Sequence, residues 1–239
     1  MLRSTIVGLL GIAASLALIR TSEGAIITYT SRGVWEAAVG PLTGTEDFNS
    51  FATDTQFRTA SVALNNMTLT GETGNNGAVA NKIDTPVFED PKTYTPLDLD
   101  GTNFIFGDLA SSQEMEFAMT AAVTAWGVDT EGIANSASMN VQMLIYSDSD
   151  VLLDTYTFPA SGDNNANGFI GVEATGGDLI GRIVFTNTTP FFDFFGLDNI
   201  GFVVPGQIPI PEPSSLVLLG IGAIGVLGFA RKRSLNRSR

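Results

Sequence analysis

The sequence predicts an all-β protein: an antiparallel β-sandwich of jelly-roll type with one short helix near its start. Short runs rich in β-branched and aromatic residues recur along the chain, and clusters of Gly, Asn and Asp separate them. No helices alternate with these runs, as a parallel α/β sheet would require. The expected strands are residues 25–30, 47–51, 67–70, 103–106, 113–119, 122–129, 140–147, 151–158, 168–173, 179–186 and 196–204.

The single helix is expected between Ser31 and Gly40. Serine is a favoured N-cap residue, and glycine ends helices because it adopts a left-handed conformation without steric cost. Val34, Trp35 and Ala38 share one face of this helix, which we expect to pack against the sheet.

We expect residues 25–205 to fold as a single β-sandwich ectodomain, because a chain of this length can bury one hydrophobic core. The composition of this region limits its possible partners. Residues 25–210 carry 23 of the 25 acidic residues, all but Glu23 and Glu212, against five basic residues, so their net charge is −18. Nucleic-acid phosphates are bound by clustered Lys and Arg, so nucleic acid is excluded as a partner. The chain has no cysteine, so disulfides do not stabilise the domain.

The absence of both His and Cys excludes most hydrolytic chemistry. Ser-His-Asp and Cys-His catalysis need an imidazole base, and zinc sites normally use His or Cys ligands. Hydrolysis of glycosides by two carboxylates stays open, but no distinctive pair stands out. Trp35 and Trp126 are the only tryptophans, which is few for a sugar-processing cleft. We therefore expect no catalytic residues and no required cofactor.

The N-terminus has the pattern of a secretory signal peptide, which we place at residues 1–24. Arg3 begins a positive region, and the 14 residues 6–19 are uncharged, too short for a comfortable membrane span. Small residues at Ser22 and Gly24 favour cleavage after Gly24, so that export by the Sec translocon leaves Ala25 first.

The C-terminus carries three features in order. A linker at residues 206–213 ends in Pro211-Glu212-Pro213, which we expect to be extended because proline disfavours helical geometry before it. The 17 uncharged residues 214–230 give a helix of roughly 25 Å, enough to cross a thin bilayer. The basic tail at residues 231–239 begins with Arg231, Lys232 and Arg233, which hold that end in the cytoplasm. A permanent, uncleaved anchor is the alternative interpretation.

This order of triplet, helix and basic cluster resembles the PEP-CTERM sorting signal, which membrane-embedded exosortases recognise in Gram-negative bacteria. The resemblance covers only the tail. It implies that the chain is anchored transiently in the inner membrane, cut near the triplet, and then released to the cell surface or outside.

Two strands contain a Gly-aliphatic-Asp step, at residues 123–129 and 194–202, and resemble strands of PEP-CTERM surface proteins with jelly-roll ectodomains. Asp129, Asp198 and Asn199 could ligate calcium at the sandwich edge. The interpretation that we favour is that Asp198 and Asn199 bond neighbouring backbone groups. Solvated turns are likewise favoured for the other acidic clusters, none of which has EF-hand spacing. These clusters are Glu89-Asp90, Asp98 with Asp100, and Asp148 with Asp150.

Two functions from different classes follow. The first is a non-catalytic surface or extracellular-matrix protein associated with exopolysaccharide. The second is a carbohydrate-binding or carboxylate-dependent carbohydrate-active module displayed by the same tail.

Overall fold

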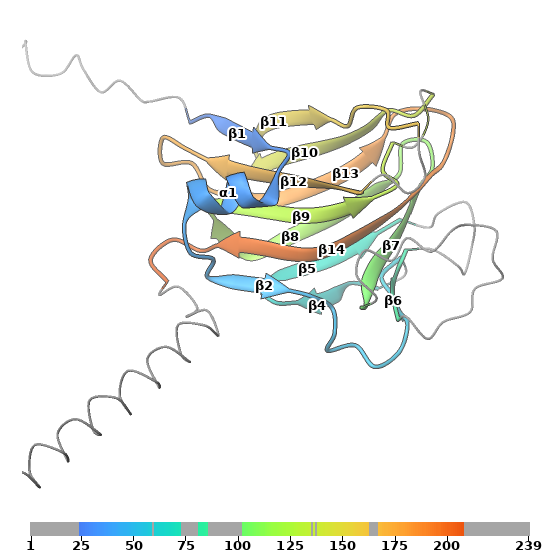
Figure 1. Cartoon of the computed structure of the whole chain (residues 1–239), viewed down its shortest axis with the longest axis horizontal. Coiled ribbons are helices and arrows are strands. Elements are labelled where there is room, and N and C mark those ends of the chain that lie inside the picture. The colour runs from blue at the N-terminus through green and yellow to red at the C-terminus, as the bar shows by residue number, and fades with distance from the viewer. Residues whose placement is uncertain are drawn as a thin grey trace, which may run out of the picture.

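The protein is a sandwich of two antiparallel β-sheets (Figure 1), as the sequence predicts. The computed structural model describes residues 24–58, 60–72, 81–85, 102–134, 136, 138–162 and 167–207. The larger sheet has eight strands, in the order β1 (Ile26–Tyr29), β12 (Asn167–Ala174), β9 (Ala125–Glu131), β14 (Asp193–Val203), β7 (Phe104–Leu109), β6 (Lys82–Asp84) and β3 (Thr55–Gln56), with β2 (Gly44–Glu46) also paired to β14. The smaller sheet has six, in the order β11 (Leu152–Thr157), β10 (Val141–Ser147), β13 (Ile180–Asn187), β8 (Glu114–Val123), β5 (Met67–Gly71) and β4 (Val62–Leu64).

The expected strand at residues 47–51 is wrong, and the strand lies earlier, at β2. Side-chain oxygens make this segment a turn: Glu46 Oε1 accepts the Phe48 N–H, and Asp47 Oδ1 accepts the Asn49 N–H. Phe48 has a φ of 57°, outside the strand region, while its ring is fully buried. The short strands β3, β4 and β6 were not expected, because two or three residues are too few to show a periodic pattern.

The expected helix is confirmed as α1 (Arg32–Val39) and ends at Gly40, whose φ is 77°. Ser31 stands at the N-cap in an extended conformation, but its side chain makes no capping bond. Of the three residues expected on the buried face, only Trp35 is buried, whereas Val34 and Ala38 are exposed. The prediction was wrong for these two because the helix lies against the outer face of the large sheet along a narrow line through Trp35 and Val39.

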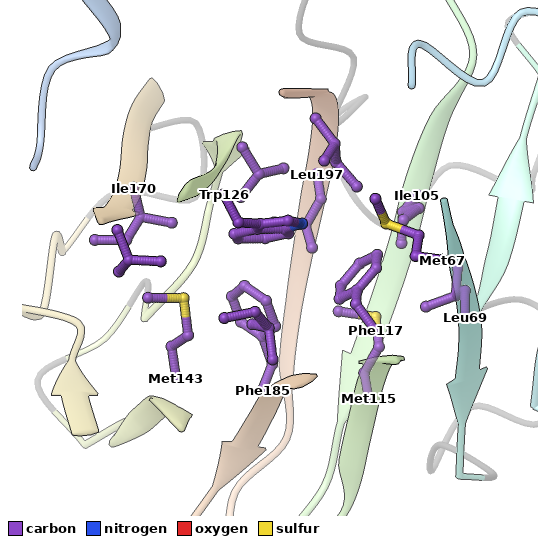
Figure 2. Packing of buried hydrophobic residues seen from close by; sticks show 14 of the residues in the cluster. Met67, Leu69, Ile105, Met115, Phe117, Trp126, Met143, Ile170, Phe185 and Leu197 are labelled. Carbon is purple, nitrogen blue, oxygen red and sulfur yellow. The ribbon is translucent and has the colours of Figure 1, made fainter. Parts of the chain in front are cut away.

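The hydrophobic core fills the space between the sheets, where every second residue of a strand points inward. In β10, for example, the inward residues are Val141, Met143 and Ile145. Figure 2 shows Trp126 of the large sheet near Phe117 and Phe185 of the small one, at ring-centroid distances of 5.5 and 6.3 Å. Such tilted aromatic pairs contribute about 0.5–1.5 kcal/mol each beyond the area that they bury.

Three glycines form a row across the outer face of the large sheet and make room for Trp35. Gly171 and Gly201 both pair with Gly127, so the three are neighbours on adjacent strands. A Cβ atom would lie 2.7 Å from the Trp35 ring at Gly171, and 3.2 Å from it at Gly127 and at Gly201. The Trp35 indole N–H donates to the Val172 carbonyl at 3.3 Å, which fixes the ring in this slot.

Both described ends of the chain lie at the same end of the sandwich (Figure 1). Ile26, the first residue of β1, pairs with Ala174, and Val203, the last of β14, pairs with Ala125. Glu173 next to Ala174 also pairs with Ala125, so the register places these residues together. The segments that precede and follow the domain therefore leave it from one end.

The glycine row yields a stability prediction. Gly171→Ala should lower the free energy of unfolding by about 1–3 kcal/mol, because the new methyl group meets ring atoms of Trp35 and Phe169 at 2.7 Å. Gly33→Ala is the matched control: its Cβ would have no atom within 4 Å, and alanine favours a helix by roughly 0.5–1 kcal/mol. Chemical denaturation measures the free energy of unfolding of both variants. Equal values would contradict the claim that Gly171 makes room for the Trp35 ring.

Candidate functional site

The structure brings Asp129, Asp198 and Asn199 together on the outer face of the large sheet. They lie on the interior strands β9 and β14 and not at the sandwich edge where we expected them. Asp129 of β9 lies directly opposite Asp198 of β14, and the register shifts just after Asp198. Asn199 sits in this bulge with a φ of 52°, a left-handed conformation that asparagine tolerates better than most residues. The Asp198 side chain is fully buried.

Arg32 of α1 lies against this cluster and supplies a positive charge. Its Nε donates to Asp129 Oδ1 at 2.9 Å, and its Nη2 donates to the backbone carbonyl of Asn199 at 2.5 Å. The guanidinium also lies 4.8 Å above the Phe169 ring, a cation–π arrangement. The residue that places Arg32 here is Trp35, one turn further along the same helix.

Asp198 accepts a hydrogen bond from the neighbouring backbone, as the interpretation that we favoured expects for this residue. Its Oδ1 accepts the Asn199 N–H at 2.6 Å, and its Oδ2 accepts the Thr102 hydroxyl at 3.4 Å. Among the described residues, no group of three or more Asp, Glu, His or Cys is placed to hold a metal ion. Calcium binding stays a prediction.

Other expected acidic residues lie in turns. Asp150 accepts hydrogen bonds from Arg182, whose guanidinium lies 3.6 Å over the Tyr146 ring, and Asp148 accepts one from Ser149. Partial burial lowers the pKa of Arg182, but hydrogen bonds and charge from Asp150 outweigh it, so the pKa is raised. The clusters at Glu89-Asp90 and at Asp98 and Asp100 lie outside the described residues.

Lys82, a buried lysine on β6, was not anticipated. Its side chain is only 2% exposed, and Nζ lies 2.9 Å from Asp54 Oδ2 and 3.3 Å from Asp84 Oδ1. Partial burial raises the pKa of Asp54, but hydrogen bonds from Lys82 and Thr85 outweigh it and hold the pKa below its ordinary value. A buried lysine is stable only with such partners, so this cluster is read as structural.

A pair of exposed aromatic side chains was also missed. Phe191 and Phe192 are 52% and 43% exposed in the loop between β13 and β14. Asn187 holds this loop: its amide donates to the carbonyls of Phe191 and Leu109 at 2.7 and 3.0 Å, and its Oδ1 accepts the Thr189 N–H. Pro190 before two aromatic residues, which breaks strand alternation, was the only signal in the sequence.

Phe192 contacts other aromatic side chains of the domain. Its ring packs edge-on against Phe194 at 5.1 Å, and Phe194 packs against Phe106 at 5.8 Å. Trp35 and Trp126, in contrast, are both fully buried and cannot contact a ligand at the surface. Phe191 and Phe192 thus form an exposed apolar surface, in which the Phe192 ring packs against Phe194.

The sorting residues Pro211, Glu212 and Pro213 and the basic residues Arg231, Lys232 and Arg233 lie outside the described residues. So do residues 1–23 of the expected signal peptide and residues 214–230, where we expected a membrane-spanning helix. Within the described ranges, no helix combines the length and apolar character needed to cross a bilayer. The described chain is held up to Val204, whose N–H donates to Thr43 Oγ1 at 2.7 Å, and ends at Gln207 after a turn.

Parts of the chain resemble solved carbohydrate-active proteins. A family 35 carbohydrate-binding module from an environmental isolate matches 55% of this chain and 88% of its own, at 16% identity and a TM-score of 0.34. A family 6 module from Clostridium cellulolyticum in complex with xylose matches 66% and 95%, at 11% identity and a TM-score of 0.28. A family 43 arabinoxylan arabinofuranohydrolase from Bacillus subtilis matches 46% of this chain at 11% identity and a TM-score of 0.32, and only 24% of that enzyme is covered. TM-scores this low carry no argument about function.

A comparison with curated proteins found no match. A family model described as the PEP-CTERM protein-sorting motif matches residues 209–233. This range contains the Pro-Glu-Pro triplet, the uncharged run and the first basic cluster, so the resemblance seen in the sequence is confirmed. The chain carries a PEP-CTERM sorting motif, which implies export, membrane-anchored sorting and processing by an exosortase.

Proposed function

We propose that this protein is a non-catalytic bacterial surface or extracellular-matrix protein. It is exported through the Sec translocon, held transiently in the inner membrane, cut near Pro211-Glu212-Pro213 by an exosortase, and delivered to the cell surface or its exopolysaccharide. The observation that carries the proposal is the sorting motif at residues 209–233, directly after the folded domain.

The geometry of the domain supports this route. Val204 is hydrogen-bonded to Thr43, the residue before β2. Pro211 follows seven residues later, and seven residues span at most roughly 25 Å when fully extended. The N-terminal leader joins the same end of the sandwich. A peptidase acting at the triplet therefore works close to this end, while the opposite end faces away from the membrane.

The side-chain chemistry supports a non-catalytic role. The paired acids of the outer sheet face are already bonded: Asp129 to Arg32, and Asp198 to Asn199 and Thr102. Without His or Cys, an enzyme here would need two carboxylates facing a cleft. A net charge of −18 over residues 25–210 also disfavours anionic partners, so the proposed exopolysaccharide partner is neutral or cationic.

Two matched lesions test the sorting route. Replacing Pro211, Glu212 and Pro213 with alanine should leave membrane insertion intact, because the uncharged run is unchanged, but should block processing. Replacing Arg231, Lys232 and Arg233 with glutamate should instead weaken the orientation, because Lys and Arg set topology and acidic residues contribute little. Intact-mass analysis of protein from a host with the matching exosortase, together with protease protection, separates the two effects.

Recovery of the unaltered chain ending at Arg239 as the dominant form of the native protein would overturn cleavage. It would leave the permanent anchor as the correct interpretation.

The second candidate function is binding of a neutral glycan, and the observation that favours it is the exposed aromatic pair Phe191 and Phe192. The C–H faces of sugar rings pack on aromatic rings, and rigid aromatic side chains bind with little loss of conformational entropy. The carbonyl of Phe191 is fixed by Asn187, and the ring of Phe192 by Phe194.

In a glycan-binding screen, any ligand found should lose affinity by at least about fivefold in Phe191→Ala and in Phe192→Ala, as central contact residues do. Val34→Ala is the control, because Val34 is also exposed, at 60%, but lies on α1. Equal affinity in all three variants would contradict this candidate. Release of reducing sugar by the wild-type protein would instead contradict the non-catalytic role.

Calcium binding by the acidic surface is proposed separately. A cation bound only by the folded state stabilises it by RT ln(1 + [L]/Kd), so millimolar Ca²⁺ should raise the melting temperature by several degrees. The control is an equal concentration of Mg²⁺, which prefers a smaller octahedral site. An unchanged midpoint in calcium would show that the carboxylates form only a solvated surface.

A further inference from the structure

We infer that Thr175 and Asp178, in the turn after β12, form a binding site for the α-ammonium group of the mature chain. This inference rests on the proposed export, because the group exists only once the leader has been cut off after Gly24. The site would hold the new N-terminus against the sheet and so complete the edge strand β1.

Thr175 already holds the backbone of Ala25 on both sides. The Thr175 N–H and hydroxyl both donate to the Ala25 carbonyl at 2.9 Å, and the Ala25 N–H lies 3.3 Å from Thr175 Oγ1. Because β1 pairs along its whole length with β12, from Ile26 opposite Ala174, the position of the Ala25 nitrogen is set by the sheet register. The Ala25 nitrogen is therefore ordered before any cleavage.

The carboxylate of Asp178 lies against the residue that cleavage removes. A Cβ atom on Gly24 would lie 1.6 Å from Asp178 Oδ2, 2.3 Å from its Cγ and 2.8 Å from the Thr175 carbonyl. Standard bond lengths then place the Ala25 nitrogen less than about 6 Å from Oδ2. A side chain at position 24 would force Asp178 and the Thr175 carbonyl to shift, and glycine is also a residue type that signal peptidases accept before the cut.

Cleavage converts this contact into an ion pair. Hydrolysis of the Gly24–Ala25 peptide bond consumes one water, leaves a carboxylate on the departing leader, and leaves Ala25 with an ammonium group. That group has three N–H donors where the amide had one, and the space vacated by Gly24 opens between it and Asp178. Thr175 Oγ1 can accept one donor, and a rotation of the half-buried Asp178 side chain lets it accept another.

The charges around the site favour this pairing. Among the described residues, Asp178 has no cationic partner. Glu173, which pairs with Ile27 two register positions from Ala25, already accepts the Tyr29 hydroxyl at 2.7 Å. That bond is the main cause of the raised pKa of Tyr29. The new ammonium is therefore the cation that Asp178 would bind, and a cut several residues upstream would place the charge away from it.

The test uses the exported, processed protein and two variants, Asp178→Asn and the control Asp154→Asn. Asp154 is an exposed acid on the edge strand β11, whose Oδ1 accepts the Thr155 N–H. Mass spectrometry of the N-terminal peptide should find Ala25 first. At neutral pH an amine-acylating reagent should label that amine about two- to fivefold faster in Asp178→Asn, the range that a half-exposed ion pair gives, and at the wild-type rate in Asp154→Asn.

Each result has a distinct meaning. An Ala25 terminus labelled at one rate in all three proteins overturns the ammonium site and leaves the export proposal standing. A terminus at any other residue also overturns the site. The C-terminal mass from the same sample decides independently whether exosortase processing occurred.

Discussion

The contact between Trp35 and the row of Gly127, Gly171 and Gly201 determines how the outer face of the large sheet is built. The helix α1 is only eight residues long, too short to be stable alone, so its position depends on burying this one indole. Three neighbouring strands each give up a side chain to make the slot. With Trp35 packed in this slot, the helix places Arg32 against Asp129 and the carbonyl of Asn199. The Arg32 guanidinium thus supplies a positive charge beside the bulge in β14.

Scarcity of basic residues is the second constraint on the domain. Arg32, Lys82 and Arg182 each lie between two carboxylates: Glu36 and Asp129, Asp54 and Asp84, and Glu116 and Asp150 respectively. The domain has a net charge of −18. Replacing one of these three basic residues would therefore remove its ion pairs and leave two neighbouring carboxylates that repel each other. Exposed acids such as Asp150 and Asp154 add to the negative surface, which keeps an exported protein dispersed and away from anionic surfaces.

The antiparallel register connects the fold with the proposed route to the surface. An odd number of antiparallel steps, through β12 and β9, separates β1 from β14, so the first strand starts where the last one ends. The start of β1 and the end of β14 therefore lie at the same end of the sandwich (Figure 1). This end carries the Thr175 and Asp178 turn, so both processing steps of the proposed route take place beside one small part of the domain.

Local patterns in the sequence were enough for the fold class, for most strands, for the helix at Arg32–Val39 and for the sorting motif at residues 209–233, because each depends on neighbouring residues along the chain. They failed at residues 47–51, where Glu46 and Asp47 side chains bond the backbone, and at Val34 and Ala38, where helix placement decides burial. Only the tertiary structure decided that Arg32 meets Asp129, that Lys82 is buried between acids, and that Asn187 presents Phe191 and Phe192. The pairs Arg32 and Asp129 and Lys82 and Asp54 join residues 97 and 28 positions apart, and no periodicity along the sequence encodes which strands become neighbours.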